Sequence, residues 1–490
     1  MTLQNLLLDF SYTIIQGSTD KLISDVVYDS RKSIQDSVFV CLKGFDTDGH
    51  KYISSAIDKG ATAIVICDDI DLSLIDSNIT IIKTLDTRYA LAFMSSAFFG
   101  YPSKQIKTVA LTGTKGKTTT VSMIRSILEK GGIKTGTIGT LGIVIGDNIY
   151  KTNNTTPESY EIQKAMRQMV DEGCKCMVIE ASSLGLKWHR TNGFTYDIGV
   201  FTNFSPDHIG DSEHANMDEY LECKAKLFKQ CNVGIFNIDD KNYNEMIKNA
   251  TCKIETYGFA NNADTVAYDD GLISKPNYLG VHFSTKGLSE IENISVPIPG
   301  KFSVYNALCA ISVARHFNVS TQDILDGINT ATVKGRVEPV KTPFEFTLLI
   351  DYAHNAVSME SVLKTLREYN PNRLITLFGA GGNRPRDRRF EMGEISGKMS
   401  DLSIITEDNS RFEDVLDIIE DIKIGMHKTD GEYVVIPNRI DAIRYCIENG
   451  QKGDIIVLAG KGHEDYQEIK GVKYHLDERD VIADILNEIK

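Results

Sequence analysis

A short loop rich in glycine, lysine and threonine carries the clearest chemical signal in the sequence. It runs Thr112-Gly113-Thr114-Lys115-Gly116-Lys117-Thr118-Thr119, directly after the apolar segment 107–112 and before a helix-like segment. A helix that starts at such a loop points backbone N–H groups at an anion, and the glycines let the backbone come close. Lys117 could reach the β- and γ-phosphates of a nucleotide, and Thr118 could ligate Mg²⁺. The loop therefore predicts nucleotide binding, in a shortened form of the Walker A pattern that has Leu111 where a further glycine is usual.

Two polar side chains follow later apolar segments that we expect to be strands of the same sheet. Glu180 stands in the segment 177–181, and His208 follows the segment 198–203. Parallel α/β sheets bind ligands at the carboxyl ends of their strands, so both side chains could hold Mg²⁺ beside a bound nucleotide. The alternative for Glu180 is the cap of a helix, since two serines come next. The alternative for an isolated histidine is an ordinary surface or core residue.

The elements that would position these residues form three α/β segments. At about 150 residues per domain, a chain of 490 residues suggests three domains. We predict a small N-terminal α/β domain at 1–102, a central domain at 103–334 with a parallel sheet like that of P-loop ATPases, and a Rossmann-like α/β domain at 335–490. Apolar runs alternate with helical segments, which is typical of parallel sheets. The predicted strands are 107–112, 177–181, 198–203, 233–238, 346–351, 373–378, 402–406 and 454–460.

The composition argues against several other classes of protein. Lys and Arg number 53 against 67 Asp and Glu, a formal charge of −14, whereas nucleic-acid binding needs a cationic surface. No apolar run approaches the roughly 18 residues of a membrane span, and the N-terminus lacks the features of a secretory signal. The nine cysteines form no Cys-x-x-Cys pair, so zinc ribbons and dithiol redox sites are unsupported. We expect a cytoplasmic monomer that neither inserts into membranes nor binds nucleic acid.

Segments along nearly the whole chain resemble the Mur ligases, the ATP-dependent amide ligases of peptidoglycan synthesis. The resemblance begins with the Gly-Lys-Thr loop, and an N-terminal segment around Asp29-Ser30-Arg31 is similar to the nucleotide-sugar segment of that family. The other matching segments are Asn154-Thr155-Thr156-Pro157, Glu180-Ala181-Ser182-Ser183, His189-Arg190, Cys223-Lys224-Ala225-Lys226, Gly335-Arg336-Val337-Glu338, Asp351-Tyr352-Ala353-His354 and Gly460-Lys461-Gly462-His463-Glu464.

The resemblance implies a reaction that makes an amide from a free carboxylate. The carboxylate attacks the γ-phosphorus of ATP to give an acyl phosphate and ADP, and an amine then displaces phosphate. Such a catalyst must hold two anions together, so it needs metal ions and cationic side chains more than a protein nucleophile. The implied substrates are ATP, a diamino acid and UDP-N-acetylmuramoyl-L-alanyl-D-glutamate (UDP-MurNAc-L-Ala-D-Glu), which receives the third residue of the stem peptide; the implied metal is Mg²⁺.

The resemblance also implies roles for single residues. Lys224, which read alone is an ordinary solvated helix lysine, would be carbamylated and would bind Mg²⁺; a desolvated lysine reaches the neutral form that this reaction needs. The catalytic and metal-binding residues would be Lys117, Thr118, Glu180, His208 and Lys224. ATP would contact Gly113, Thr114, Lys115, Gly116, Lys117, Thr118, Thr119, Asn306, Arg336, Asp351 and His354. The UDP-sugar would contact Ser30, Asn154, Thr155, Thr156, Ser182 and Arg190.

The segment after strand 402–406 bears on the amino acid that is added. Asp408-Asn409-Ser410-Arg411 resembles the Asp-Asn-Pro-Arg motif of members that add meso-diaminopimelate. This amino acid differs from lysine by a second carboxylate, which Arg411 could bind bidentately. The alternative for Arg411 is a solvated cation in the first turn of the next helix, where the helix dipole disfavours positive charge. We favour diaminopimelate over L-lysine and expect contacts from Arg389, Asp408, Asn409, Arg411, Gly460 and Glu464, the last of which could accept the distal ammonium.

Some positions depart from the family pattern, and other functions stay open. Leu184, Trp188 and Ser410 stand where other residues are usual in the family. Lys115 and Asn355 are similar to the residues at these positions in lysine-adding members. A folylpolyglutamate-type ligase shares the chemistry but fits the N-terminal segment less well. A P-loop NTPase that acts as a switch would not need the second α/β domain. A non-catalytic relative is disfavoured because the charged residues of the site are present.

Overall fold

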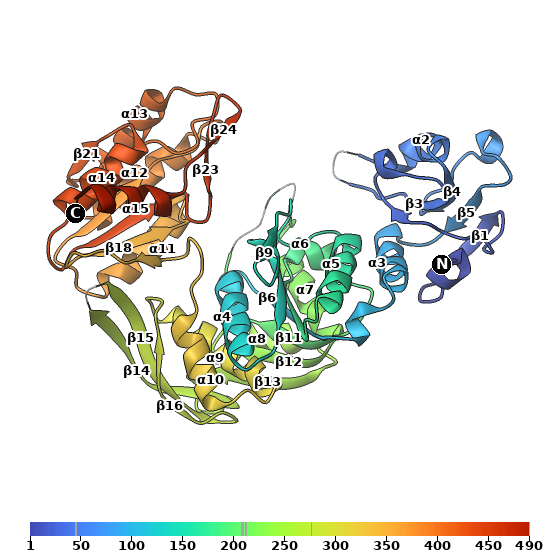
Figure 1. Cartoon of the computed structure of the whole chain (residues 1–490), viewed down its shortest axis with the longest axis horizontal. Helices are drawn as coiled ribbons and strands as arrows, with labels where there is room; N and C mark the ends of the chain where they lie inside the picture. The colour runs from blue at the N-terminus through green and yellow to red at the C-terminus, as the bar shows by residue number, and fades with distance from the viewer. Residues whose placement is uncertain (45–46, 207–209, 211–212, 276, 490) are drawn as a thin grey trace. The chain divides into compact units, whose positions relative to one another are not determined.

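The computed structural model describes residues 1–44, 47–206, 210, 213–275 and 277–489. The chain forms two compact units, of which one comprises Met1–Val266 with Leu308–Ile324 and the other Ala267–Ala307 with Leu325–Lys490. Within the described ranges the strands form sheets of five, eleven, six and two strands, and helices flank the larger sheets (Figure 1). The three larger sheets correspond to the three predicted α/β domains, so this fold class is confirmed, while the limits of the domains stay a prediction.

The N-terminal sheet has the strand order β1-β5-β4-β3-β2. Its strands are parallel except for β1, which is antiparallel to β5. Alternate residues of β3 face opposite sides of the sheet: Val38 and Val40 join one core, and Phe39 joins another. The elements are α1 Leu3–Leu6, β1 Thr13–Gln16, β2 Val26–Val27, η1 Ser30–Lys32, β3 Ser37–Val40, η2 Gly49–Tyr52, α2 Ile53–Asp58, β4 Ala61–Ile66, η3 Leu72–Leu74, β5 Thr80–Lys83, α3 Thr87–Phe98 and η4 Pro102–Lys104.

The central sheet carries the nucleotide loop. Strands β7, β10, β6, β11, β12 and β13 are parallel neighbours in that order, and α4 packs against β10 and β7. The elements are β6 Lys107–Thr112, α4 Lys117–Lys130, β7 Thr135–Gly139, β8 Gly142–Ile145, β9 Asn148–Tyr150, α5 Ser159–Asp171, β10 Cys176–Glu180, α6 Ser183–Lys187, β11 Tyr196–Phe201, α7 Met217–Ala225, η5 Lys226–Lys229, β12 Cys231–Asn237, α8 Tyr243–Ile247 and β13 Lys253–Gly258.

The central sheet is mostly parallel, as predicted, but it also has antiparallel strands. β8 and β9 are antiparallel additions beyond β7. The turn between β7 and β8 has two residues, which reverses the chain and cannot make a parallel crossover. Gly142, at φ +100°, begins the returning strand. The chain continues through β14 Thr265–Lys275, β15 Tyr278–Gly287, β16 Ile291–Val296, α9 Phe302–Arg315 and α10 Thr321–Thr330.

The C-terminal sheet has the order β17-β18-β22-β19-β20-β21 and is parallel except for β17. Helices cover both of its faces, so Leu349 and Ile350 of one strand enter two separate cores, as predicted for a Rossmann-like domain. The elements are β17 Glu338–Val340, β18 Thr347–Asp351, α11 Ala356–Arg367, β19 Leu374–Phe378, α12 Asp387–Met399, β20 Leu402–Ile405, α13 Val415–Met426, β21 Tyr433–Val435, α14 Arg439–Asn449, β22 Ile455–Ala459, β23 Tyr466–Ile469, β24 Val472–His475 and α15 Glu478–Ile489.

A buried arginine ties together two strand ends of this domain. Arg439 and Glu478 are both fully buried, with Nη2 of the arginine 2.8 Å from Oε1 of the glutamate. The guanidinium also donates to the carbonyls of Ala459 (2.9 Å) and Glu407 (3.1 Å). The next residue after each carbonyl lines the cavity described below. Arg439 therefore positions two lining segments.

We expect Arg439→Met to lower the free energy of unfolding by about 3–5 kcal/mol, because it leaves a carboxylate buried without its cation. Urea denaturation measures this change. The control is Arg444→Met on the same helix, whose side chain is 33% exposed; we expect it to change stability by less than about 1 kcal/mol. An Arg439→Met protein as stable as the control would contradict this account of the domain.

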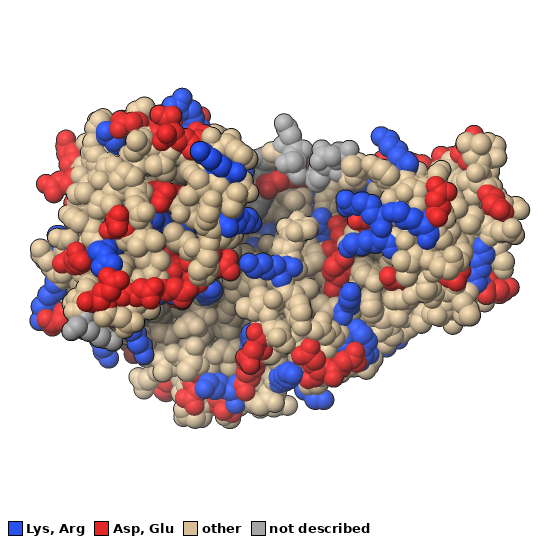
Figure 2. All heavy atoms as spheres, turned by 45° about the horizontal axis from the view of Figure 1, so that its top comes forward, with Lys and Arg blue, Asp and Glu red and all other residues tan. Residues whose placement is uncertain are grey.

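The surface carries charge of both signs. Acidic and basic side chains lie interspersed on the face that Figure 2 displays, and exposed pairs such as Lys83 and Asp69, 2.6 Å apart, are common. Among the described residues, no helix is both long and apolar enough to cross a lipid bilayer.

Candidate active site

The nucleotide loop follows β6 and ends where α4 begins. Gly113 has φ +148°, and a Cβ there would lie 2.0 Å from Thr202 Oγ1. Gly116 has φ +83° and is the N-cap of α4, to which it contributes no side-chain hydrogen bond. Both positions require glycine, since one is crowded and the other is left-handed. The uncapped first turn of α4 leaves backbone N–H groups for an anion.

The residues after β11 hold this loop in place. The backbone N–H of Thr114 donates to Asn203 O, and that of Lys115 donates to Asn203 Oδ1, both at 2.9 Å. Thr202 Oγ1 donates to Lys115 O at 2.9 Å. The sequence analysis named neither residue as part of the site, although both stand at the end of the predicted strand 198–203. Lys117 lies over the loop, and its Nζ donates to the carbonyls of Gly113 (2.8 Å) and Thr114 (3.1 Å).

Glu180 closes one side of the loop at the end of β10. Glu180 is 2% exposed. Its carboxylate accepts hydrogen bonds from Thr118 Oγ1 at 3.0 Å and from the backbone N–H of Thr140 at 2.9 Å. The capping alternative is wrong, because Ser182 caps α6 by accepting from Gly185 N at 3.0 Å. Thr118, Thr140 and Glu180 together offer hard oxygen ligands, the set that Mg²⁺ prefers. Thr140 is a further site residue that the sequence analysis missed, and His208 lies outside the described residues.

Lys224 reaches the loop from α7. It is 1% exposed, its Nζ donates to Gly113 O at 2.8 Å, and the same atom lies 4.4 Å from the centre of the Tyr220 ring. The Tyr220 hydroxyl is 3.2 Å from Thr114 Oγ1. The interpretation of Lys224 as a solvated helix lysine is therefore wrong. Lys117 and Lys224 share one carbonyl, which brings two lysines to the same turn.

A cavity of about 140 Å³ lies at the carboxyl ends of β19, β20 and β22 in the C-terminal domain. All six residues predicted to contact the amino acid line it. The lining residues are Tyr352, His354, Ala380, Gly381, Arg384, Pro385, Arg388, Arg389, Met392, Asp408, Asn409, Arg411, Gly460 and Glu464.

A buried lysine organises the acidic side of this cavity. Lys461 is fully buried, and its Nζ donates to Asn409 Oδ1 at 3.1 Å and lies 3.4 Å from Asp408 and 3.5 Å from Glu464. Asn409 Nδ2 donates to Glu464 Oε2 at 2.9 Å. Burial disfavours the Asp408 carboxylate, yet Lys461 and Arg439 hold the pKa of this group below its usual value. The sequence analysis quoted Lys461 within a motif but gave it no role.

Comparison with known proteins identifies the family of this chain. The family models for the Mur ligase family catalytic domain, the Mur ligase middle domain and the Mur ligase glutamate ligase domain match residues 22–98, 111–314 and 335–462. A UDP-N-acetylmuramoyl-L-alanyl-D-glutamate–2,6-diaminopimelate ligase of Caldanaerobacter subterraneus subsp. tengcongensis is 42% identical over 475 residues, 97% of either chain. The chain belongs to the Mur ligase family. It is a ligase of the ATP-dependent kind that the family comprises.

Other relatives support the same branch of the Mur ligase family. The 2,6-diaminopimelate ligase 2 of Clostridium acetobutylicum is 40% identical over 99% of this chain and 100% of its own. A solved UDP-N-acetylmuramoyl-L-alanyl-D-glutamate–2,6-diaminopimelate ligase matches with a TM-score of 0.74 and 28% identity, over 100% of this chain and 99% of its own. The folylpolyglutamate synthase of Mycobacterium tuberculosis covers 75% of this chain and 91% of its own, with a TM-score of 0.58 and 17% identity, so it shares the fold alone.

Three of the residues predicted to contact the UDP-sugar, Thr155, Thr156 and Ser182, lie close to Glu180 or to its hydrogen-bond partner Thr140. Thr156 Oγ1 donates to Glu180 O at 2.7 Å and is 2.9 Å from Ser182 Oγ, and Thr155 Oγ1 lies 3.4 Å from Thr140 Oγ1. Ser30 is buried in η1 of the N-terminal domain. Asn154 is exposed.

Arg190 is paired with an acid in this structure. Its Nε lies 3.0 Å from Glu158 Oε1, and Arg88 Nη1 lies 2.9 Å from the same carboxylate. The Arg88 guanidinium also lies 5.0 Å from the ring of Trp188, which gives this departure from the family pattern a packing partner. Arg88 is a cation near the predicted substrate residues that sequence reasoning did not find.

The four remaining residues predicted for ATP belong to the second unit. Asn306 is buried in α9, and the Arg336 guanidinium lies 5.1 Å from the Tyr352 ring. Asp351 accepts from the backbone N–H groups of Val337 and Ala353, both at 2.8 Å, and burial raises the pKa of its carboxyl. His354 lines the cavity of the C-terminal domain.

Two arginines of the cavity have protein partners. Arg389 is 1% exposed, and its Nη atoms donate to Asp421 (2.9 Å) and Glu413 (2.8 Å). Arg411 Nη1 donates to Gly382 O at 2.7 Å, and its Nε lies 3.4 Å from Glu468.

The placement of Arg411 in the first turn of a helix is wrong. Helix α13 begins at Val415, and Asp414 caps it. Arg411 stands before the helix with φ +51°. No sequence pattern predicted this left-handed conformation. The helix-dipole argument therefore does not apply to this residue.

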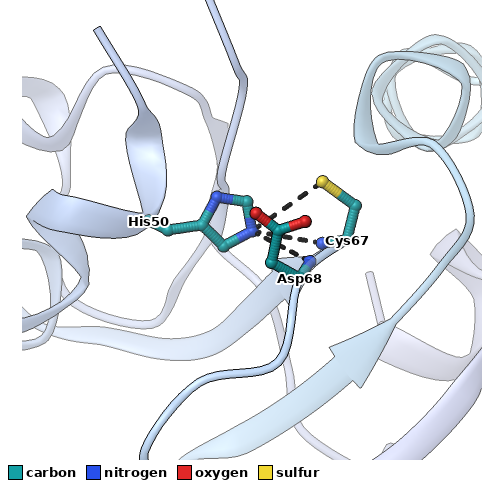
Figure 3. Close-up of side chains that lie close together, drawn as sticks. All are labelled: His50, Cys67 and Asp68. Carbon is teal, nitrogen blue, oxygen red and sulfur yellow. Dashed lines mark hydrogen bonds between the residues drawn. The ribbon is translucent and has the colours of Figure 1, made fainter.

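A second group of potential metal ligands, in the N-terminal domain, is a structural clamp (Figure 3). His50 Nδ1 lies 2.6 Å from Asp48 Oδ1, and its Nε2 accepts from the backbone N–H groups of Cys67 (3.2 Å) and Asp68 (3.4 Å). Both ring nitrogens are thus occupied, and they join η2 to the end of β4.

Proposed function

We propose that the chain ligates meso-2,6-diaminopimelate to UDP-MurNAc-L-Ala-D-Glu through an acyl phosphate, with conversion of ATP to ADP and phosphate. The observation that carries the proposal is the cavity of the C-terminal domain, where arginines and acids stand together. Carboxylates are recognised by guanidinium groups and ammonium groups by acids. The names of the relatives agree with this substrate.

The proposed site for phosphoryl transfer is the loop between β6 and α4. The first turn of α4 and Lys117 would bind the β- and γ-phosphates. Thr118 and Glu180, with the undescribed His208, would hold Mg²⁺; the bound ion would neutralise charge on the transferring phosphoryl group. Glu180 is preorganised for this role by Thr118 and Thr140, its hydrogen-bond donors.

Lys224 is proposed to act as a carbamate. The reaction with CO₂ needs a neutral amine, and burial of a lysine side chain favours the neutral form. The product is an anion, which a nearby metal ion would stabilise. The burial of Lys224 and its contact with Gly113 support this role.

We also propose that the protein is a monomer, that it acts in the cytoplasm, and that its domains meet near residues 102 and 334. A ligase that consumes ATP and a nucleotide sugar needs the compartment where both are made.

Phosphate release tests the proposed function. The enzyme should release phosphate only when both UDP-MurNAc-L-Ala-D-Glu and an amino acid are present. The UDP-sugar supplies the carboxylate that forms the acyl phosphate, and the amino acid supplies the amine that displaces phosphate from it. Substantial turnover of ATP with neither substrate would instead indicate an NTPase.

We expect Arg411→Ala to lower kcat/KM for diaminopimelate by about tenfold or more, with a much smaller effect on the KM for ATP. The guanidinium lines the cavity and is held by Gly382 and Glu468, so it is positioned for a carboxylate. Steady-state kinetics with both amino acids measures the effect, and Phe412→Ala, at an exposed neighbouring position, is the control. If the preference of the variant for diaminopimelate over L-lysine is unchanged, Arg411 does not determine the specificity for the amino acid.

A further inference from the structure

Arg88, at the start of α3, shares one carboxylate with Arg190, which is predicted to contact the UDP-sugar. Arg88 Nη1 lies 2.9 Å from both carboxylate oxygens of Glu158, and Arg190 Nε lies 3.0 Å from one of them. Arg190 Nη1 donates to Thr156 O at 3.2 Å, and its Nη2 donates to no residue that the structure describes. Two cations thus share one anion, and the group of three keeps a net positive charge.

Arg88 is fixed by contacts other than the one with Glu158. Its side chain is 13% exposed, its Nη2 donates to Lys43 O at 3.1 Å, and its guanidinium lies 5.0 Å from the centre of the Trp188 ring. A guanidinium stacked on an aromatic face keeps its charge and loses conformational freedom. Arg88 is therefore a preorganised partner for the carboxylate.

The first turn of α3 also fixes the backbone from which Arg190 extends. His189, the residue before it, has φ +54°, a left-handed conformation that is uncommon for residues other than glycine and persists where contacts hold it. The His189 ring meets the ring of Tyr89 edge-on at 5.5 Å, and its Nε2 lies 3.6 Å from Asp86 Oδ2. Both partners flank Arg88 in sequence, so one segment holds Arg190 and its carboxylate partner together.

Glu158 would compete with an anionic ligand for Arg190. In the structure it accepts from Arg88 through both oxygens and from Arg190 through one. Without Arg88, both oxygens could turn to Arg190, and the resulting pair would be neutral. A guanidinium binds a phosphate or a carboxylate through two parallel hydrogen bonds, so an arginine already paired in this way offers less to a substrate.

We propose that Arg88 is a positioning residue for the UDP-sugar: it occupies Glu158 and so leaves Arg190 able to bind an anionic group of that substrate. The inference rests on the proposed function and adds a residue that acts through Arg190, without touching the substrate itself. The net positive charge of the three residues is what the anionic UDP-sugar meets. Removing Arg88 cancels this charge, and removing Glu158 as well restores it.

The experiment compares Arg88→Gln, Glu158→Gln and the double variant with the wild type. Initial rates over a range of UDP-MurNAc-L-Ala-D-Glu concentrations, at saturating ATP and diaminopimelate, give kcat and KM separately. We expect Arg88→Gln to raise the KM for the UDP-sugar about tenfold, with kcat and the KM for ATP within about threefold of the wild type. Glu158→Gln should keep or lower this KM, and the double variant should return it to within about threefold of the wild type, because Arg190 then has no competing carboxylate.

Arg167→Gln is the control for these variants. Arg167 pairs with Asp171 at 2.6 Å near the other end of α5, the helix that begins directly after Glu158. The control removes an arginine from a carboxylate without touching the shared group, so its KM for the UDP-sugar should equal that of the wild type.

A folded Arg88→Gln enzyme with the wild-type KM for the UDP-sugar overturns this inference and leaves the proposed function intact. A double variant whose KM stays as high as that of Arg88→Gln also overturns it, because Arg88 would then act otherwise than through Glu158. Melting temperatures check folding. If Arg88→Gln unfolds, Glu158→Gln decides, and a KM about tenfold above the wild type in that variant overturns the competition. A wild type that forms no product from UDP-MurNAc-L-Ala-D-Glu overturns the proposed function and the inference with it.

Discussion

Lys117→Ala is expected to abolish ligation, with a fall in kcat of about 10³-fold. Lys117 is the first residue of α4, and its Nζ lies over the loop within hydrogen-bond distance of two loop carbonyls. The charge developing on the γ-phosphoryl group would lose a preorganised cation. Coupled measurement of ADP release, with both other substrates saturating, reports the loss.

The matched control for this variant is Lys130→Ala, at the exposed last residue of the same helix. It removes the same charge from α4 and should leave kcat within about twofold of the wild type. A Lys117→Ala enzyme with near-normal turnover would show that the loop is structural.

Lys224→Ala is expected to be inactive, with a loss of about 10²-fold or more, and to regain part of its activity with acetate. Burial beside Gly113 leaves room for a short carboxylate once the side chain is removed, and that carboxylate would stand in for the carbamate. Lys224→Arg should be inactive without rescue, because a guanidinium keeps the positive charge and fills the space. Initial rates across an acetate titration measure the effect.

Lys226→Ala provides the control for this second variant, since Lys226 is exposed two residues further along. It should behave as the wild type with and without acetate. A fully active Lys224→Ala enzyme would remove the carbamate from the mechanism. An inactive one that no short carboxylate rescues would assign Lys224 to holding the loop through Gly113.

Much of the fold could be predicted from apolar runs and their spacing. The strand predicted at 107–112 coincides with β6, because a buried parallel strand is apolar throughout and its ends are marked by polar residues. The antiparallel strands β8 and β9 were not predicted. They are short, and the three residues of β9 are all exposed, so no hydrophobic pattern distinguishes them from a loop.

The placement of the candidate site residues could be predicted where residue type and position along a strand decided it. Lys117 and Glu180 are local to a motif or a strand end, and the cavity contains all six residues predicted for the amino acid. Contacts between distant segments were not predictable. Arg389 pairs with Glu413 and Asp421, which lie 24 and 32 residues further along the chain. The left-handed backbone of Arg411 depends on tertiary packing that a single sequence does not display.

The most direct test of the proposed function is the product formed from a mixture of amino acids. The purified protein is incubated with ATP, Mg²⁺, UDP-MurNAc-L-Ala-D-Glu and equal concentrations of meso-diaminopimelate, L-lysine and L-glutamate, and the products are resolved by mass spectrometry. The account predicts one main product, heavier than the acceptor by one diaminopimelate residue, with one ADP formed per product. A lysine or glutamate adduct as the main product, or ADP formed without any adduct, would contradict it.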